Sequence, residues 1–305
     1  MERSDGQTAE QVAPSTGVSF FDKVDAEYKG ALRAARDANV TAALLEDIGT
    51  GDQTGRLVPA DEMRRALIIV REAACLCGSP WFDEVMHRID PRIEITWQVA
   101  EGAWMHPGMP VCEMRGPVRA LLTAERNALN FLQLLSGVAT TTRRYVELLD
   151  GTAARVLDTR KTLPGLRLAQ KYAVRVGGGE NQRLALYDGI LIKENHIAAA
   201  GGVGAALEAA WALNAGVPVQ IEVESIAQLH EALAHGATSI LLDNFNVAMM
   251  REAVQISGEK ILLEVSGGVN ADSIRAFAET GVDRISVGVL TKDVRATDYS
   301  MRIID

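Results

Sequence analysis

Short apolar runs recur through the second half of the chain, and this rhythm constrains the fold more than any other feature. Six runs follow residue 150, with helical patterns between them: Val156-Leu157, Gly189–Ile192, Val219–Val223, Ser239–Leu242, Lys260–Val265 and Asp283–Val287. The last four are about twenty residues apart, so each repeat holds one strand and one helix. Repeated βα units imply parallel strands with right-handed crossovers. The pattern predicts an α/β fold, as a barrel or as an open doubly wound sheet.

Two of the intervening helices carry recognisable boundary signals. Ser225 followed by Gln228 predicts a capping box at the start of a helix over residues 225–235. Asn270 predicts the start of another helix, which Gly281 ends. Both signals agree with a strand-then-helix repeat.

The residues that follow the apolar runs distinguish the two topologies. Each run ends in charged residues or glycine: Arg160 and Lys161, Lys193, Glu222 and Glu224, Asp243, Ser266-Gly267-Gly268, and Gly288. In an open sheet, such residues are expected only near the switch point. In a barrel, the carboxyl ends of all strands converge on one site. We therefore predict a barrel with its site at that end.

The chain before residue 150 has a different texture. Residues 1–16 are polar and are predicted to form a flexible tail, and residues 20–45 read as helical, with Leu45 among the apolar positions. Residues 66–115 contain short β-rich runs broken by glycine and proline, which is typical of mixed α+β structure. Residues 120–149 predict a long helix, in which Gly137 is a candidate break.

Composition excludes several classes of protein. Lys and Arg number 31 and Asp and Glu number 40, so the formal charge is −9, and general nucleic-acid binding is not expected. No segment reaches the ~18 apolar residues of a membrane span, and the tail lacks a secretory apolar region, so the predicted location is cytoplasmic. Three cysteines, Cys75, Cys77 and Cys112, are an odd number in a long chain, so a disulfide framework is not expected. Core packing of Cys75 and Cys77 is favoured over metal binding, because no Cys/His pair with zinc spacing follows them.

Two glycine signals follow the last two strands, where βα barrels commonly bind phosphate. Ser266-Gly267-Gly268 offers close backbone approach and a hydroxyl group, and Val287-Gly288-Val289 offers a second bare turn. Ordinary βα turns are the alternative for each. Gly177-Gly178-Gly179 follows a helix, so it is interpreted as a flexible connection rather than a dinucleotide-binding loop.

Four cations define the predicted substrate. Arg160, Lys161, Arg183 and Lys193 together indicate a ligand that carries several negative charges. Lys193 ends an apolar run that should be buried, and an unpaired buried ammonium group is costly. We therefore expect a functional role for this lysine.

Two carboxylates are predicted to face these cations. Glu222 and Asp243 end neighbouring strands, and they are interpreted either as a structural ion-pair network or as part of the site. In the second case they would bind hydroxyl groups, hold Mg²⁺ for a polyphosphate, or stabilise a developing positive charge. Glu224 shares the face of Glu222 but lies beyond it.

Long motifs then occur in an order that matches a known family. They are Glu125–Phe131, Leu135-Ser136-Gly137, Leu157–Arg167, Gly177–Arg183, Ile192–His196, Glu222-Val223-Glu224, Leu242–Phe245, Ser266–Gly268 and Ile285–Gly288. From about residue 45 to 305, the chain resembles the quinolinate phosphoribosyltransferases, or nicotinate-nucleotide pyrophosphorylases (carboxylating). Two positions depart from the family: Gln182 stands where His is typical, and Leu163 replaces a second Thr.

This resemblance implies an architecture. It implies an N-terminal α/β sandwich domain (17–137 plus 291–305) beside an incomplete, seven-stranded βα barrel (138–290). It also implies a homodimer with shared active sites, in which Arg126 serves the site of the partner.

The resemblance also assigns roles around the barrel. Thr159, Arg160, Lys161, Gln182, Arg183 and Lys193 match the residues around quinolinate and pyrophosphate, with Gln182 at the position of the usual His. Glu222 and Asp243 match the acidic pair at the ribose, which makes them candidates for Mg²⁺. Ser266, Gly267, Gly268, Val287, Gly288 and Val289 match the site of the 5′-phosphate. Lys161, Lys193, Glu222 and Asp243 are the expected catalytic residues.

The implied reaction joins quinolinate to phosphoribosyl pyrophosphate and releases CO2 and pyrophosphate, giving nicotinate mononucleotide for NAD biosynthesis. One rival is a Schiff-base aldolase-type lyase with Lys193 as nucleophile. That hypothesis assigns no function to Arg126, Arg160 and Lys161. A second rival is a non-catalytic relative associated with metal uptake.

Overall fold

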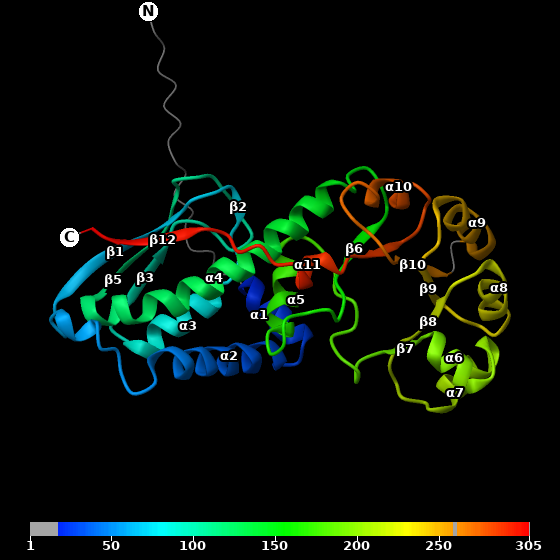
Figure 1. Ribbon diagram of the computed structural model, residues 1–305, viewed down its shortest axis with the longest axis horizontal. Helices are drawn as coiled ribbons and strands as arrows, with labels where there is room; N and C mark the ends of the chain where they lie inside the picture. Colours follow the sequence, from blue (N-terminus) through cyan, green and yellow to red (C-terminus); the bar gives the residue numbers. More distant parts are fainter. Residues whose placement is uncertain (1–17, 259–260, 305) are drawn as a thin grey trace, which may run out of the picture.

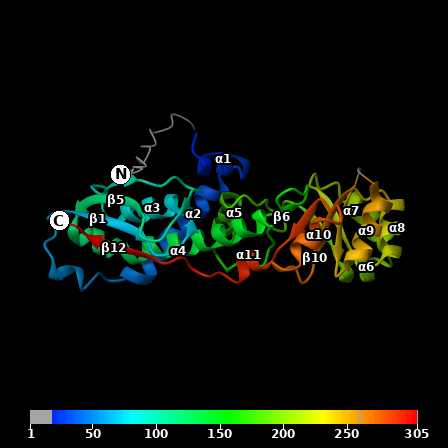
Figure 2. The ribbon, with the colours of Figure 1, turned by 90° about the horizontal axis from the view of Figure 1, so that it is seen from above.

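The computed structural model describes residues 18–258 and 261–304, so the predicted flexible tail, residues 1–16, lies outside the described residues. The molecule is elongated, with an antiparallel sheet at one end and a parallel sheet at the other (Figures 1 and 2). Helix α4 (Val118–Glu147) runs along the antiparallel sheet towards the parallel one, and α5 (Arg167–Val176) lies between the two sheets (Figure 1). An α/β fold with a parallel sheet and an N-terminal domain is therefore confirmed.

The antiparallel sheet has the strand order β12-β1-β5-β3, so its last strand comes from the C-terminal end of the described chain. Its strands are β1 (Met63–Val70), β3 (Glu94–Trp97), β5 (Pro110–Pro117) and β12 (Tyr299–Ile303). Alternate residues of β1, Ala66, Ile68 and Val70, are fully buried, because successive side chains of a strand point to opposite faces. Tyr299 of β12 pairs with Val70, so the C-terminal segment completes this sheet.

Helices and short elements surround the antiparallel sheet. They are α1 (Phe20–Glu27), α2 (Ala31–Ile48), the 3₁₀ helix η1 (Gly55–Leu57), α3 (Ser79–Ile89), and the paired short strands β2 (Ala74–Cys75) and β4 (Trp104–Met105). The predicted helical stretch over residues 20–45 is thus two helices, separated at Gly30, whose φ of +83° is left-handed. All three cysteines are buried free thiols, which confirms their packing role.

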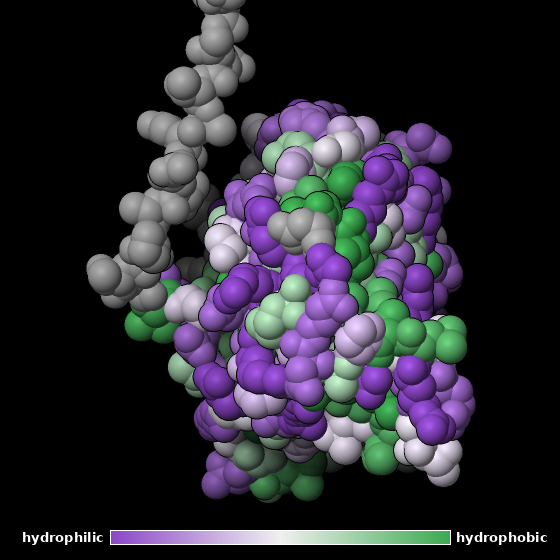
Figure 3. Space-filling view, turned by 90° about the vertical axis from the view of Figure 1, so that its left-hand side faces the viewer, coloured by the Kyte–Doolittle hydropathy of each residue, from purple (hydrophilic) through white to green (hydrophobic). Residues whose placement is uncertain are grey.

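The surface at the antiparallel end is mainly hydrophilic, with hydrophobic residues between the polar ones (Figure 3). Leu45, which the sequence pattern assigned to an apolar helical face, is 71 % exposed, whereas its neighbour Leu44 packs against the core, so Leu45 lies on the outer face of α2. Leu57 and Leu122 are also exposed. Within residues 18–258 and 261–304, no helix has the length and apolar character that crossing a membrane requires.

Gly137 does not break the long helix, contrary to the sequence expectation. Helix α4 continues through it without interruption. A Cβ atom at this position would lie 2.2 Å from the backbone oxygen of Arg295. The glycine therefore permits the C-terminal segment to cross α4 closely, and the predicted boundary at residues 137–138 falls inside one helix.

Asp83 on α3 is a titratable group inside the N-terminal region. Its Oδ1 accepts a hydrogen bond from Trp97 Nε1 at 3.0 Å. Burial raises the pKa of Asp83 from 3.8 to about 6, although the Trp97 bond and His87 oppose this shift. Because the folded protein then binds more protons than the unfolded chain between these values, stability falls as pH rises from about 4 to about 6.

Replacement of Asp83 by asparagine tests this pH dependence. Asn retains an acceptor for Trp97 but carries no charge, so at pH ~7 the variant should be more stable on the order of 2 kcal/mol. The difference should shrink towards pH ~4, where the wild-type carboxyl is largely protonated. Urea unfolding of both proteins across this pH range measures it. A difference that does not vary with pH would exclude the titration of Asp83 as its cause.

The parallel sheet has the strand order β6-β11-β10-β9-β8-β7. Its strands are β6 (Arg155–Leu157), β7 (Ile190–Ile192), β8 (Val219–Val223), β9 (Ser239–Asp243), β10 (Leu262–Ser266) and β11 (Arg284–Ser286). An isolated parallel bridge joins Leu157 to Glu180 beyond β6. The sequence repeat therefore predicted the parallel pairing correctly.

Helices connect these strands along the outside of the sheet (Figure 1). They are α6 (Glu194–Ala200), α7 (Val203–Ala212), α8 (Ile226–Ala234), α9 (Val247–Ser257), α10 (Ile274–Ala278) and α11 (Val289–Lys292). Ser225 caps α8 as predicted, but the Gln228 side chain accepts from Glu224 N instead of closing the box. Helix α10 begins later than predicted, because Asn270 Oδ1 caps a preceding turn at Asp272 and Ser273.

Candidate active site

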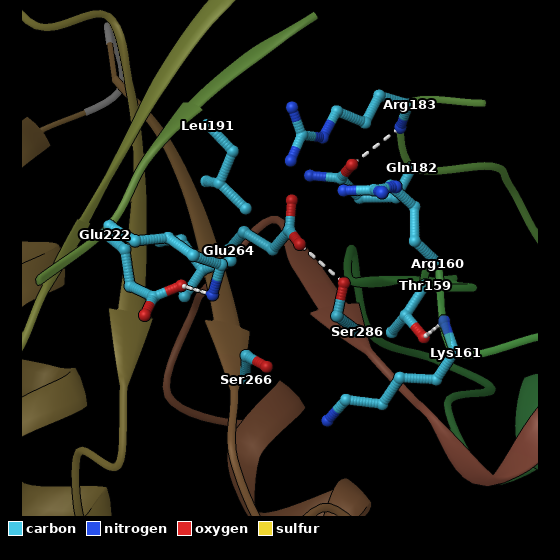
Figure 4. Close-up of a pocket in the computed structure, with 12 residues that line it drawn as sticks. Thr159, Arg160, Lys161, Gln182, Arg183, Leu191, Glu222, Glu264, Ser266 and Ser286 are labelled. Carbon is cyan, nitrogen blue, oxygen red and sulfur yellow. Dashed lines mark hydrogen bonds and ion pairs between the residues drawn. The ribbon is translucent and has the colours of Figure 1, made fainter. Parts of the chain in front are cut away.

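One pocket lies at the carboxyl ends of the parallel strands and gathers most of the predicted site residues (Figure 4). The predicted residues that line it are Thr159, Arg160, Lys161, Gln182, Arg183, Lys193, Glu222 and Ser266. Leu191, Leu241, Glu264 and Ser286 complete the lining. Side chains from the carboxyl ends of the parallel strands therefore converge on one pocket, as the sequence pattern predicted.

The loop with Arg160 and Lys161 is held by buried polar contacts. The amide of Gln170, which has no exposed surface, accepts from Leu163 N at 2.8 Å and donates to Thr291 O at 2.8 Å. Thr291 Oγ1 donates to Lys161 O at 2.8 Å. These contacts connect the loop to α11 at Lys161 and, through Gln170, at Leu163, and so hold the backbone of this segment in place.

The two glycines after β10 are required by close approach or by backbone conformation, whereas Gly288 after β11 has room for a Cβ atom. A Cβ atom on Gly288 would lie 3.4 Å from Lys161 Cδ, and one on Gly267 would lie 2.5 Å from Asn244 Oδ1. Gly267 and Gly268 have φ values of +94° and +61°, which glycine adopts without strain. Val287 has its side chain in the core, and that of Val289 is partly buried, so only their backbones are available to a ligand.

Lys193 is not the buried lysine that the apolar run suggested. Its side chain is 45 % exposed, because it stands at the N-cap of α6, where the strand has ended. Its Nζ donates to Glu222 Oε2 at 2.8 Å, and the Glu222 side chain is only 8 % exposed. Burial raises the pKa of Glu222, Lys193 opposes this, and the charge of Asp243 adds to it.

Two guanidinium groups share one side of the pocket. Arg183 Nη1 donates to Gly189 O at 2.8 Å, and burial together with the nearby charge of Arg160 lowers the pKa of Arg183. Arg160 Nε is buried and has no hydrogen-bond partner among the described residues. Adjacent like charges and an unsatisfied buried donor are both costly, and an anionic ligand would relieve both.

Gln182 is engaged by its neighbours. Its Nε2 donates to Gln220 Oε1 at 2.8 Å, and its Oε1 accepts from Arg183 N at 2.6 Å. An amide nitrogen carries two hydrogens, so one remains for a ligand. The sequence identified Gln182 as a pocket residue but not these contacts.

A buried ion pair below the site was missed by sequence reasoning. Asp158 and Lys171 have no exposed surface, and Lys171 Nζ donates to Asp158 Oδ1 and to Gln182 O. Asp158 also accepts from Asn181 Nδ2 at 2.6 Å and from Gln182 N at 2.9 Å. The pair therefore fixes the backbone that carries Gln182. Asp158 lies directly before the Arg160 loop, but nothing in the sequence indicates its partner.

Three other residues that sequence reasoning missed lie on strands of the parallel sheet: Gln220 on β8, Glu264 on β10 and Ser286 on β11. Gln220 lies two residues before Glu222, and Glu264 two before Ser266. Because side chains alternate along a strand, residues two apart share a face. This alternation was the available signal for both.

The three consecutive glycines do not form the flexible connection that the sequence suggested. A Cβ atom on Gly177 would lie 2.6 Å from Ala139 O, and one on Gly179 would lie 2.9 Å from Thr142 Cγ2. The segment is thus packed against α4, and glycine permits that approach.

Seven predicted residues are not part of the pocket lining. Five of them follow β10 and β11, namely Gly267, Gly268, Val287, Gly288 and Val289, and the other two are Asp243 and Arg126. Asp243 ends β9 beside the pocket, where its Oδ2 accepts from Asn244 Nδ2 at 2.8 Å and its charge acts on Glu222. Arg126 is exposed on α4 and lines a different hollow with Asp47, Asp52 and Thr54. Within one subunit, Arg126 does not contribute to the pocket.

Comparisons with known proteins agree over nearly the whole chain. Family models described as the N-terminal and C-terminal domains of quinolinate phosphoribosyl transferase match residues 52–136 and 138–302. The nicotinate-nucleotide pyrophosphorylase (carboxylating) of Mycobacterium leprae is 43 % identical, covering 88 % of this chain and 96 % of that protein. The probable enzyme of the same name from Bacillus subtilis is 41 % identical, covering 85 % and 90 %.

A solved structure extends this similarity to three dimensions. The nicotinate-nucleotide pyrophosphorylase from Francisella tularensis is 44 % identical and superposes with a TM-score of 0.86, covering 89 % of this chain and 96 % of that one.

Proposed function

The chain belongs to the quinolinate phosphoribosyltransferase family, and on that premise we propose how its pocket carries out the family's reaction. The enzyme transfers the phosphoribosyl group of phosphoribosyl pyrophosphate to quinolinate and decarboxylates the product. Nicotinate mononucleotide, pyrophosphate and CO2 are formed, a step of NAD biosynthesis. The observation that carries the assignment to this pocket is its cluster of cations around the unsatisfied Arg160.

Quinolinate, a dianion, is proposed to bind between the guanidinium groups of Arg160 and Arg183, near Gln182. A carboxylate there would satisfy Arg160 Nε and separate two like charges. Thr159, whose Oγ1 accepts from Lys161 N at 3.0 Å, shapes the same loop. The ring nitrogen then attacks C1 of the ribose, and its positive charge favours loss of the adjacent carboxylate.

The ribosyl and phosphate groups are proposed to lie towards β8–β11. Glu222 and Asp243 would stabilise the oxocarbenium-like centre at C1 electrostatically. Lys161 and Lys193 would bind the pyrophosphate as it leaves, and Lys193 would move from Glu222 towards it. The 5′-phosphate would bind Ser266, Gly267 and Gly268 and the backbone of Val287, Gly288 and Val289.

Mg²⁺ is proposed to accompany the pyrophosphate. Glu222 and Asp243 supply hard oxygen donors from neighbouring strand ends, and Mg²⁺ commonly binds one or two carboxylates together with substrate phosphates. These two residues would hold the ion, which would neutralise charge on the phosphates. Protein carboxylates alone would form only part of its coordination.

We also propose the finer architecture. The Leu157–Glu180 bridge supports a seventh, minimal strand, so the parallel sheet is read as an incomplete barrel of residues 138–290. The pairing of β12 with β1 supports an N-terminal sandwich domain of residues 17–137 plus 291–305. A cytoplasmic location and the absence of nucleic-acid or membrane partners are proposed from composition.

A homodimer with shared sites is supported by Arg126. The arginine is exposed beside Leu122 and Leu57, which are also exposed, so a cation and apolar surface lie together far from the subunit's own pocket. If a second subunit covered this surface with the mouth of its pocket, Arg126 of the first subunit would reach the pocket of the second.

Mixed dimers test the shared site. Arg126→Ala and Lys193→Met should each be nearly inactive alone. In a mixed dimer, one site receives both intact residues, so random mixing should restore about a quarter of wild-type sites, provided that subunits exchange. Subunit exchange is verified with differently tagged chains. Mixed dimers that form but stay inactive would refute the sharing of sites.

The function itself is tested by supplying quinolinate, phosphoribosyl pyrophosphate and Mg²⁺ to the purified protein. Formation of nicotinate mononucleotide and CO2 in equal amounts is expected. Borohydride trapping of a keto substrate on Lys193, without nicotinate mononucleotide, would instead favour the aldolase alternative. Binding without turnover would favour the non-catalytic alternative associated with metal uptake.

A further inference from the structure

A chain of hydrogen bonds runs across the bottom of the pocket, from β11 to the loop before β7. Ser286 Oγ donates to Glu264 Oε1, and Gln220 Nε2 donates to Glu264 Oε2 at 2.9 Å. Gln182 Nε2 then donates to Gln220 Oε1 at 2.8 Å, and Arg183 N donates to Gln182 Oε1 at 2.6 Å. Figure 4 shows Glu264 at the centre, with its carboxylate directed towards Gln182 and Ser286.

The chain has only one direction that satisfies all its members. A carboxylate accepts hydrogen bonds, so Gln220 must present its nitrogen to Glu264 and its oxygen to Gln182. At the other end, a backbone N–H only donates, so Gln182 must present its oxygen to Arg183. If the amide of either glutamine were turned around, a donor would face a donor on one side and an acceptor would face an acceptor on the other. The acceptor at Glu264 thereby determines which way Gln220 faces, and the Gln220 oxygen acts together with Arg183 N to determine which way Gln182 faces.

Burial makes this direction costly to change. Glu264 is 1 % exposed and Gln220 8 % exposed, so breaking a hydrogen bond of either residue leaves a largely desolvated polar group. Gln182, Gln220 and Glu264 also border a second hollow at the opposite strand ends, beside Pro218, Ser239 and Arg284. These three residues are therefore called the floor of the pocket.

We propose that Glu264 is a positioning residue for quinolinate. Through Gln220 it holds the Gln182 amide with its nitrogen in the pocket, so that the second amide hydrogen of Gln182 donates to a substrate carboxylate. Arg160 and Arg183 supply the positive charge that attracts quinolinate, and the floor determines how quinolinate is oriented and how far it enters the pocket. This inference rests on the proposed function, since it assigns the Gln182 side of the pocket to quinolinate.

The test is a double-mutant cycle on Gln182 and Gln220. Gln182→Ala should raise the KM for quinolinate at least about tenfold, the loss of one hydrogen bond from a neutral amide to a charged carboxylate. Gln220→Met keeps the volume but removes the link, and should raise it similarly. If Gln220 acts through Gln182, the double variant should match Gln182→Ala. The KM for phosphoribosyl pyrophosphate should stay within about twofold, because the lost hydrogen bond is made to quinolinate and not to the other substrate.

A second pair of variants separates direction from charge. Glu264→Gln still offers Gln220 an oxygen, so its KM for quinolinate should be no higher than that of the wild type. Glu264→Met offers none and should resemble Gln220→Met. Gln255→Met, the same change at an exposed position on α9, is the matched control. Calorimetric titration with quinolinate provides a readout independent of turnover.

Several outcomes would overturn the inference. Multiplying effects in the double variant would show that Gln220 and Gln182 act separately, and equal losses in both Glu264 variants would show that charge matters rather than direction. Equal effects on both substrates would indicate general damage to the fold. A wild-type protein that forms no nicotinate mononucleotide would refute the proposed function, whereas a turning-over wild type with unchanged variants would refute only the role of Glu264. If a variant in the Gln182 and Gln220 cycle does not fold, the two Glu264 variants still test the inference, and the converse also holds.

Discussion

Replacement of Lys161 or Lys193 by methionine is expected to lower the rate of nicotinate mononucleotide formation at least ~10²-fold, about 2.7 kcal/mol of transition-state stabilisation. Methionine keeps most of the volume and removes the charge. Both lysines line the pocket, and Lys161 lies against Gly288 at the proposed phosphate site. Loss of either cation leaves a polyanionic transition state with less compensation.

Initial rates with both substrates varied would measure this loss. Lys23→Met, the same change at an exposed position on α1, is the control and should turn over normally. Near-normal kcat/KM in a folded Lys161 or Lys193 variant would remove that lysine from the mechanism. The Lys193 variant has a further consequence, because Glu222 loses the group that lowers its pKa and should be protonated over a wider pH range.

Much of the site could be predicted because strand ends are visible in a sequence. A charged residue or glycine directly after an apolar run must lie at the carboxyl end of a strand, and parallel strands bring those ends together. Lys161, Glu222 and Ser266 were placed by this argument, and all three line the pocket. The same argument failed for the exposure of Lys193, because the point where a strand stops and a helix cap begins shifts by a residue without altering the pattern.

The residues that support the site could not be predicted in the same way. The partner of Asp158 is Lys171, thirteen positions away on a helix, and that of Glu264 is Gln220, on the second strand along the sheet. Such pairings depend on three-dimensional register, and a single sequence does not specify them. Gly137 and Gly177 were misread for a related reason: their neighbours, Arg295 and Ala139, become close only in the folded chain.

The buried ion pair of Asp158 and Lys171 leads to the largest expected effect on stability. Burial raises the pKa of Asp158 to about 6 despite the adjacent ammonium group, and burial lowers the pKa of Lys171. Desolvation therefore outweighs the attraction between the two groups, as is common for buried pairs. Such a pair contributes little net stability when intact, but each member is needed to compensate the other.

Lys171→Met should accordingly lower the free energy of unfolding by about 3–5 kcal/mol, because it leaves Asp158 buried without its cation. It should also raise the pKa of Asp158 further, so the loss should be smaller at acidic pH, where the carboxyl is protonated. The double variant Asp158→Asn/Lys171→Met buries no charge and should recover most of the stability. Urea unfolding of the wild type, both single variants and the double variant completes the cycle. Additive losses in the double variant would mean that the two residues stabilise the fold independently, and the segment from Asn181 to Arg183 would then owe its position to other contacts.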